Sequence, residues 1–127
     1  MGLIIGRSAS KRASAQQSNM AYEAVAGDTP SVTLALNKVV ECTSEAPTSV
    51  SVSLPSAPTS EADRALECVL RFRTGASAPT VSFPAELRWA NGEVMAVEAD
   101  TNYEFSIVYS IDGWNIIGQA FKAAASE

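Results

Sequence analysis

The chain has 127 residues and a mass of 13.3 kDa, which is room for one domain of ordinary size. It carries a formal net charge of −5 and contains no histidine. Without histidine there is no Ser–His or Cys–His nucleophile pair and no His-containing zinc site. The acidic balance is also the opposite of the clustered Lys and Arg that nucleic-acid binding requires. A binding or structural protein is therefore favoured over an enzyme, with no specific nucleic-acid partner.

Charge is distributed unevenly along the chain. Residues 1–20 contain three basic residues and no acidic one, whereas residues 31–127 contain six basic and twelve acidic residues. The first segment is otherwise rich in Ser, Ala and Gln and shows no strand alternation. This contrast predicts an N-terminal attachment arm over residues 1–30, disordered as a free chain, with a weak helix over residues 14–26.

We expect the arm to bind other chains. Ordering its backbone costs about 1–2 kcal/mol per residue, and its composition offers little apolar area to offset that cost. A second copy of the protein is one candidate partner, because the acidic body complements the basic arm. The expected partner-binding residues are an apolar anchor and the basic side chains that follow it: Leu3, Ile4, Ile5, Arg7, Lys11 and Arg12.

Beyond the arm, short runs of alternating apolar and polar residues are separated by turn residues. Ser49–Leu54 alternates strictly, Leu66–Arg73 follows a Pro- and Ser-rich loop, and Tyr103–Ile111 carries the longest one-face apolar row. Two earlier strands are expected at Val32–Leu36 and Val39–Cys42. Strands at about ten-residue spacing are typical of an all-β domain.

The pattern predicts an antiparallel β-sandwich, jelly-roll-like, of about eight strands over residues 31–121, with residues 122–127 as a C-terminal tail. Asn91-Gly92 is the strongest hairpin signal, and Asp112-Gly113 indicates a second tight turn. Three prolines should lie at strand ends, because proline cannot donate to a ladder: Pro55, Pro79 and Pro84. The expected core comprises Val50, Val52, Leu70, Phe72, Val81, Trp89, Tyr103, Phe105, Ile107 and Trp114.

The two cysteines, Cys42 and Cys68, are too few for a disulfide framework or a four-ligand zinc site. Free cysteine often behaves as a small buried hydrophobe. A single bridge between neighbouring strands is the alternative, and the sequence leaves both open.

The catalytic and glycan-binding candidates each have a plainer structural explanation. Ser8 and Lys11 match a Ser-x-x-Lys pattern but lie in the polar arm. Two acidic pairs, Glu61 with Asp63 and Glu98 with Asp100, have the spacing of a carboxylate pair and also of a solvated face. Four aromatic residues form either a sugar-stacking platform or core: Trp89, Tyr103, Tyr109 and Trp114. We favour the plainer explanations, and expect no catalytic residue, cofactor or metal.

No membrane-spanning segment is expected, because no stretch approaches the roughly 18 apolar residues that a span needs. The apolar N-terminal run is too short for a signal peptide, so no export signal is expected either.

Three stretches of the body resemble a small β module of tailed-bacteriophage virion proteins. They are Glu67-Cys68-Val69-Leu70-Arg71-Phe72, then Phe83-Pro84 with Leu87-Arg88-Trp89-Ala90-Asn91-Gly92, and finally the run from Glu98 to Ile107. The resemblance covers roughly residues 32–121 and includes no catalytic residue. It implies a virion structural protein, made in the host cytoplasm.

The resemblance favours a capsid-decoration or head-fibre component attached through its arm, because only a short segment precedes the module. Its partners would be a capsid or tail protein and further copies of itself, with a homotrimer as the first hypothesis. The alternatives are a tail-tip or baseplate protein that binds host glycans, a free carbohydrate-binding module, or a carboxylate-based glycan hydrolase.

Overall fold

The computed structural model describes residues 20–57, 66–110 and 113–122, and it is all-β with mixed sheets. One short 3₁₀ helix, η2 (Ala90–Gly92), accompanies the strands in this part of the chain. No described helix has the length and apolar character needed to cross a membrane. The strands are β1 (Ala21–Val25), β2 (Ser31–Thr33), β3 (Lys38–Cys42), β4 (Ser49–Ser53), β5 (Leu66–Arg73), β6 (Thr80–Ser82), β7 (Arg88–Trp89), β8 (Asn102–Ser110) and β9 (Gly113–Phe121).

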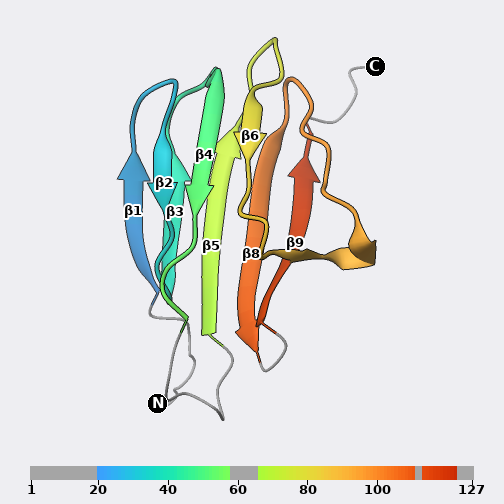
Figure 1. Cartoon of the computed structure of the whole chain (residues 1–127). Helices are drawn as coiled ribbons and strands as arrows, with labels where there is room; N and C mark the ends of the chain where they lie inside the picture. The colour runs from blue at the N-terminus through green and yellow to red at the C-terminus, as the bar shows by residue number, and fades with distance from the viewer. Residues whose placement is uncertain (1–19, 58–65, 111–112, 123–127) are drawn as a thin grey trace, which may run out of the picture.

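The strands form two sheets that lie one in front of the other (Figure 1). The larger sheet has the order β1-β3-β5-β8-β9-β7, and the smaller has the order β2-β4-β6. From β1 to β6 the chain changes sheet at every connection. As a result, β1, β3 and β5 run parallel in the larger sheet, and β2, β4 and β6 run parallel in the smaller one. Only β8 pairs antiparallel, with β5 on one side and β9 on the other.

The expectation of an antiparallel arrangement is therefore wrong for five of the seven described strand pairs. Alternation along one segment identifies a strand with one buried face, but it does not determine the direction of the neighbouring strand. From β1 to β6 the connections cross between the layers instead of folding back as hairpins. A jelly roll is built from antiparallel Greek keys, so this winding departs from that pattern.

Backbone hydrogen bonds continue around the turns that join the two layers. The carbonyl of Asp28 accepts from the Thr48 amide at 2.7 Å, and the carbonyl of Thr48 accepts from the Thr80 amide at 3.1 Å. In another turn, the Asn37 amide donates to the Glu67 carbonyl at 2.7 Å, with Asn37 held at a φ of 60°. These hydrogen bonds stack successive turns on one another and satisfy the backbone groups that form them.

The space between the sheets is filled by side chains from both of them. Eight of the ten residues expected in the core are buried, while Val81 and Trp89 are partly buried and pack against it. Pro79 directly precedes β6, and Pro55 and Pro84 lie just beyond the ends of β4 and β6, as expected. The buried cluster comprises Val32, Leu34, Val40, Cys42, Val50, Val52, Cys68, Leu70, Phe72, Leu87, Tyr103, Phe105, Ile107, Trp114 and Ile116.

Phe105 of β8 is the centre of an aromatic cluster in this core. Its ring centroid lies 5.7 Å from Phe72, 5.9 Å from Tyr103, 5.1 Å from Phe83 and 6.0 Å from Trp89. Phe72 comes from the neighbouring strand β5 and Tyr103 from β8 itself, whereas Phe83 follows β6 of the other sheet. The cluster therefore ties the two layers together, and ring pairs of this kind are worth about 0.5–1.5 kcal/mol beyond their buried area.

Two expectations about local structure are wrong. The helix expected over residues 14–26 is replaced by a strand where the chain is described, since β1 pairs with β3. Asn91 and Gly92 do adopt the positive φ angles of a tight turn, 62° and 76°, but they lie in η2 and not in a hairpin. Helix propensity is a weak preference that pairing with a neighbouring strand overrides.

The second turn is where the sequence places it. β8 and β9 pair antiparallel, with Ser110 opposite Gly113. Gly113 has a φ of 103°, a conformation that favours glycine. The strands expected at Val32–Leu36 and Val39–Cys42 correspond to β2 and β3.

Gly118→Ala should lower the stability of the protein. A Cβ at Gly118 would lie 2.6 Å from both the Phe105 ring and the Met95 sulfur, closer than van der Waals contact allows. We expect the free energy of unfolding, measured by urea denaturation, to fall by about 1–3 kcal/mol. Gln119→Ala, at the exposed neighbouring position, is the control and should change it by less than about 0.5 kcal/mol. Equal stability of both variants would contradict this account of the core.

Candidate binding face

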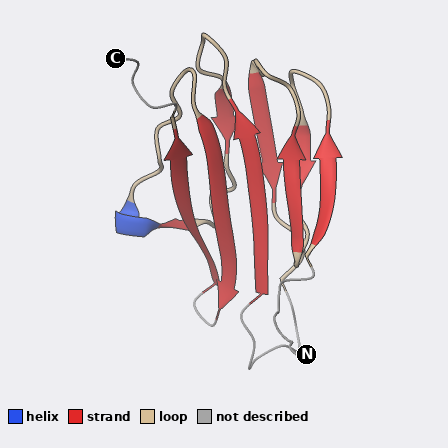
Figure 2. Ribbon diagram, turned by 180° about the vertical axis from the view of Figure 1, so that it is seen from behind, coloured by secondary structure: helices blue, strands red, loops and turns tan. Residues whose placement is uncertain are grey.

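The larger sheet has one side turned away from the smaller sheet, which we call the outer face. In the view from behind, no described helix or strand lies in front of it (Figure 2). Side chains alternate between the two sides of each strand. In β5, for example, Leu70 and Phe72 point into the core, so Val69 and Arg71 point to the outer face. The register of the sheet then shows which residues of the neighbouring strands lie on the outer face.

An apolar row crosses the outer face over five strands. Tyr22, Val39, Val69, Ser106 and Ile117 are paired in register from β1 to β9. Four of the five are apolar, and the Ser106 hydroxyl donates to the Glu67 Oε2 at 2.5 Å. Tyr22 and Ile117, at the two ends of the row, are 59% and 58% exposed, whereas Val69 in the middle is buried. Large apolar side chains at these two positions are therefore in contact with solvent on an open sheet surface.

A charged row runs beside the apolar row. Glu41, Arg71 and Glu104 are paired in register on β3, β5 and β8. The Arg71 Nε donates to the Glu104 Oε1 at 3.1 Å, and the Tyr22 hydroxyl donates to the Glu41 Oε1 at 2.8 Å. That hydrogen bond is the main reason why the pKa of Tyr22 is raised, with desolvation and the negative charge of Glu41 adding to it. The two rows are thus linked through Tyr22.

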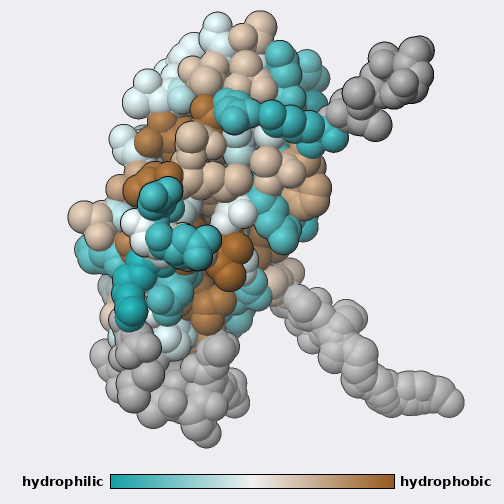
Figure 3. Space-filling model, turned by 90° about the vertical axis from the view of Figure 1, so that its right-hand side faces the viewer, coloured by the Kyte–Doolittle hydropathy of each residue, from teal (hydrophilic) through white to brown (hydrophobic). Residues whose placement is uncertain are grey.

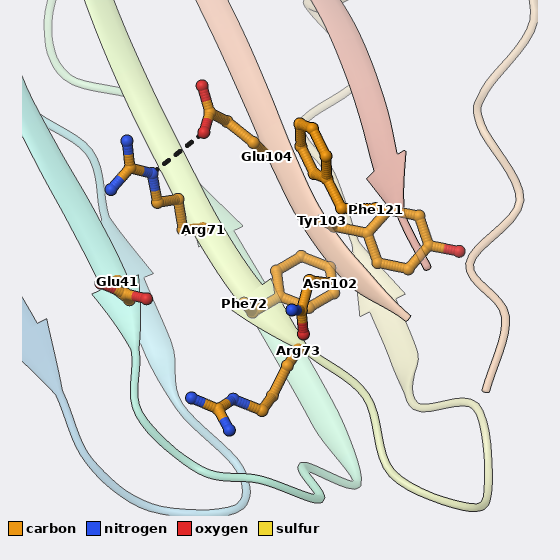
Figure 4. A pocket seen from close by; sticks show the side chains of 8 residues that line it. All are labelled: Glu41, Arg71, Phe72, Arg73, Asn102, Tyr103, Glu104 and Phe121. Carbon is orange, nitrogen blue, oxygen red and sulfur yellow. Dashed lines mark hydrogen bonds and ion pairs between the residues drawn. The ribbon is translucent and has the colours of Figure 1, made fainter. Parts of the chain in front are cut away.

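A hollow of about 220 Å³ lies over the ends of β5, β8 and β9 on the outer face (Figure 4). Arg73, Asn102 and Phe121 are paired in register there, and the Phe121 ring is 52% exposed. The hollow therefore combines a guanidinium, an amide and an exposed ring. Its full lining is Glu41, Arg71, Phe72, Arg73, Asn102, Tyr103, Glu104 and Phe121.

The outer face is balanced in charge although the protein is acidic. Of the described residues, ten are acidic and five are basic. The register places equal numbers of each on this face: Arg71, Arg73 and Arg88, with Glu41, Glu67 and Glu104. Seen from the β9 side, hydrophobic and hydrophilic residues are intermixed on the surface (Figure 3). Most of the described negative charge therefore lies elsewhere.

The residues expected to bind partners through the arm lie outside the described residues: Leu3, Ile4, Ile5, Arg7, Lys11 and Arg12. The same holds for Ser8, Glu61 and Asp63. Glu98 and Asp100 are described and exposed, and Glu98 forms an ion pair with Lys122. This pair lowers the pKa of Glu98 and raises that of Lys122. Within the three described stretches, no group of three His, Cys, Asp or Glu residues could hold a metal ion.

All four aromatic residues considered as a sugar platform belong to the core or pack against it. Tyr103 is buried, and Trp89 and Tyr109 are partly buried against the core. Trp114 is buried as well, with its ring 4.8 Å from that of Tyr109. The large exposed rings are instead Tyr22 and Phe121, which sequence reasoning missed. The sequence feature that could have indicated them is an apolar residue on the polar side of an alternating strand, as at Ile117 in β9.

Both cysteines are buried and free, as the plainer interpretation held. Cys68 is opposite Lys38, four residues before Cys42 on β3, so the two lie about 13 Å apart along the strands. A disulfide needs Cα atoms about 4.4–6.8 Å apart. Burial raises the pKa of each thiol to about 11, with smaller contributions from Glu41 and Glu67. Both thiols are therefore protonated near neutral pH.

No model of a known protein family matches this chain, and no curated protein or solved structure does.

The buried thiols predict that stability falls in alkaline solution. Each folded-state pKa of about 11 exceeds the ordinary value of 9.0, so the stabilisation is fully present below pH 9 and is lost as the pH rises towards 11. At pH 10 we expect a loss of about 1 kcal/mol per thiol. Urea titrations at pH 8 and 10 measure it, and the Cys42→Ala/Cys68→Ala variant should show a smaller difference between the two. An unchanged difference would contradict the prediction.

Proposed function

We propose that this protein is a structural component of a bacteriophage virion and not an enzyme. The role we favour is capsid decoration or a head fibre, attached to the particle through the part of the N-terminal arm that precedes β1, because β1 belongs to the larger sheet. Its partners are a capsid or tail protein and further copies of itself, and a homotrimer is the assembly we test first. The resemblance of the body to virion β modules supports the phage assignment.

The observation that carries a structural role is the outer face. It is an open sheet surface with large apolar side chains exposed at both ends of one row and with balanced charge. Surfaces of this kind pack against other proteins, because burying them removes apolar area from water without leaving unpaired charge. We further propose that the two sheets form a β-sandwich, supported by the core that they share.

The proposed attachment can be tested with two substituted full-length chains. One replaces the apolar anchor (Leu3→Ser, Ile4→Ser, Ile5→Ser), and the other removes the basic charges (Arg7→Ala, Lys11→Ala, Arg12→Ala). We expect both to keep the far-ultraviolet spectrum of the parent and to lose attachment to phage particles in a co-sedimentation assay. A chain carrying Ser8→Ala and Ser10→Ala is the control and should still attach. Full attachment of both test chains would overturn the proposal.

The hollow favours a second candidate, a tail-tip or baseplate protein that binds host glycans. Sugar sites combine an exposed ring with planar polar groups, and Phe121, Asn102 and Arg73 offer that combination. Under this alternative, Phe121→Ala and Asn102→Ala should each weaken binding on a glycan array at least tenfold. Val94→Ala, at a similarly exposed position on a loop, should leave binding unchanged. Absence of glycan binding by the parent chain would remove the candidate.

A further inference from the structure

We propose that the outer face of the larger sheet is where a second copy of this chain binds. The inference rests on the assembly role proposed above, and it assigns to that role a surface separate from the arm. Three properties of the face support it: the apolar side chains exposed at the ends of its row, its charge and its size.

The apolar row makes the face costly to leave in water. Tyr22 and Ile117 are more than half exposed at opposite ends of the row, and Phe121 lies nearby on β9. Within one chain, the inner side of the same sheet is covered by β2, β4 and β6, whereas no described element covers the outer side. Burial of apolar area contributes about 25 cal/mol per Å², so a partner that covers this row gains the most at these residues.

The charges favour a copy of the same chain as that partner. Copies with net charge −5 repel one another over most orientations. The outer face is an exception, because its three arginines and three glutamates balance. In the charged row the signs alternate as Glu41, Arg71 and Glu104, so an arginine of one copy can approach a glutamate of the other. A strongly basic or acidic partner finds no such match.

The size of the face is sufficient for association. Five strands at about 4.8 Å spacing span about 19 Å, and β8 and β9 extend about 30 Å. The resulting area of about 600 Å² per copy is at the lower end of standard protein interfaces. We therefore expect association that is complete at high protein concentration and reversed by dilution.

Light scattering coupled to size-exclusion chromatography tests the inference on the full chain. At about 100 µM the parent should have a mass of at least twice the 13.3 kDa of one chain. Ile117→Glu places a charge in the apolar row and should weaken association at least tenfold with an unchanged far-ultraviolet spectrum. Val94→Glu is the matched control, because Val94 is 65% exposed outside the sheet, and it should associate like the parent.

A charge swap keeps the test independent of any single substitution. Arg71→Glu should also weaken association at least tenfold, because it makes the charged row uniformly acidic. The double variant Arg71→Glu/Glu104→Arg restores the sign balance and the pair within the chain, so it should associate within about threefold of the parent.

Four results would overturn the inference. They are a monomeric parent at 100 µM, an Ile117→Glu chain that associates like the parent, a Val94→Glu chain that dissociates like Ile117→Glu, and a charge swap that fails to restore association. The arm variants described above should retain the parental mass. Loss of particle attachment with retained mass, or the reverse, therefore separates failure of the attachment role from failure of this inference.

Discussion

The contact between Phe105 and the rings around it is the interaction on which the two-layered arrangement depends. Phe105 lies in the middle of β8, the strand between β5 and β9 in the larger sheet. Phe83 reaches it from the smaller sheet, and Gly118 on β9 leaves the room that the ring needs. One side chain thus joins both sheets and limits the size of the side chain that β9 can have at position 118. A close-packed interior transmits any change of volume at such a position.

The winding of the chain explains why one sheet face remains open. Each connection from β1 to β6 crosses between layers, so two strands that are consecutive in the chain add one strand to each sheet. The last strands, β8 and β9, extend the larger sheet alone. None of the described segments crosses the outer face (Figure 2). A broad surface with paired charges and exposed apolar ends is the consequence.

The proposed roles use two separate parts of the molecule. Attachment to a particle is assigned to the basic, apolar-tipped arm, whereas association between copies is assigned to the outer face. The division has a physical basis, since the arm carries an excess of positive charge and the face carries none. An arm of that sign suits an acidic partner surface, and a balanced face suits its own copy.

The sequence by itself determined the all-β class, most strand positions, the core and the turn at Gly113, because alternation and turn chemistry are local signals. Strand direction, the strand at β1 and the outer face were decided by tertiary structure. The direction of a strand relative to its neighbour depends on whether the connection before it crosses between layers. The residues near Asn91, for example, indicate a tight turn but not the direction of the next strand. Likewise, Tyr22 and Ile117 lie in one row only because β1 to β9 pair in register, and pairing across the sheet is a long-range property.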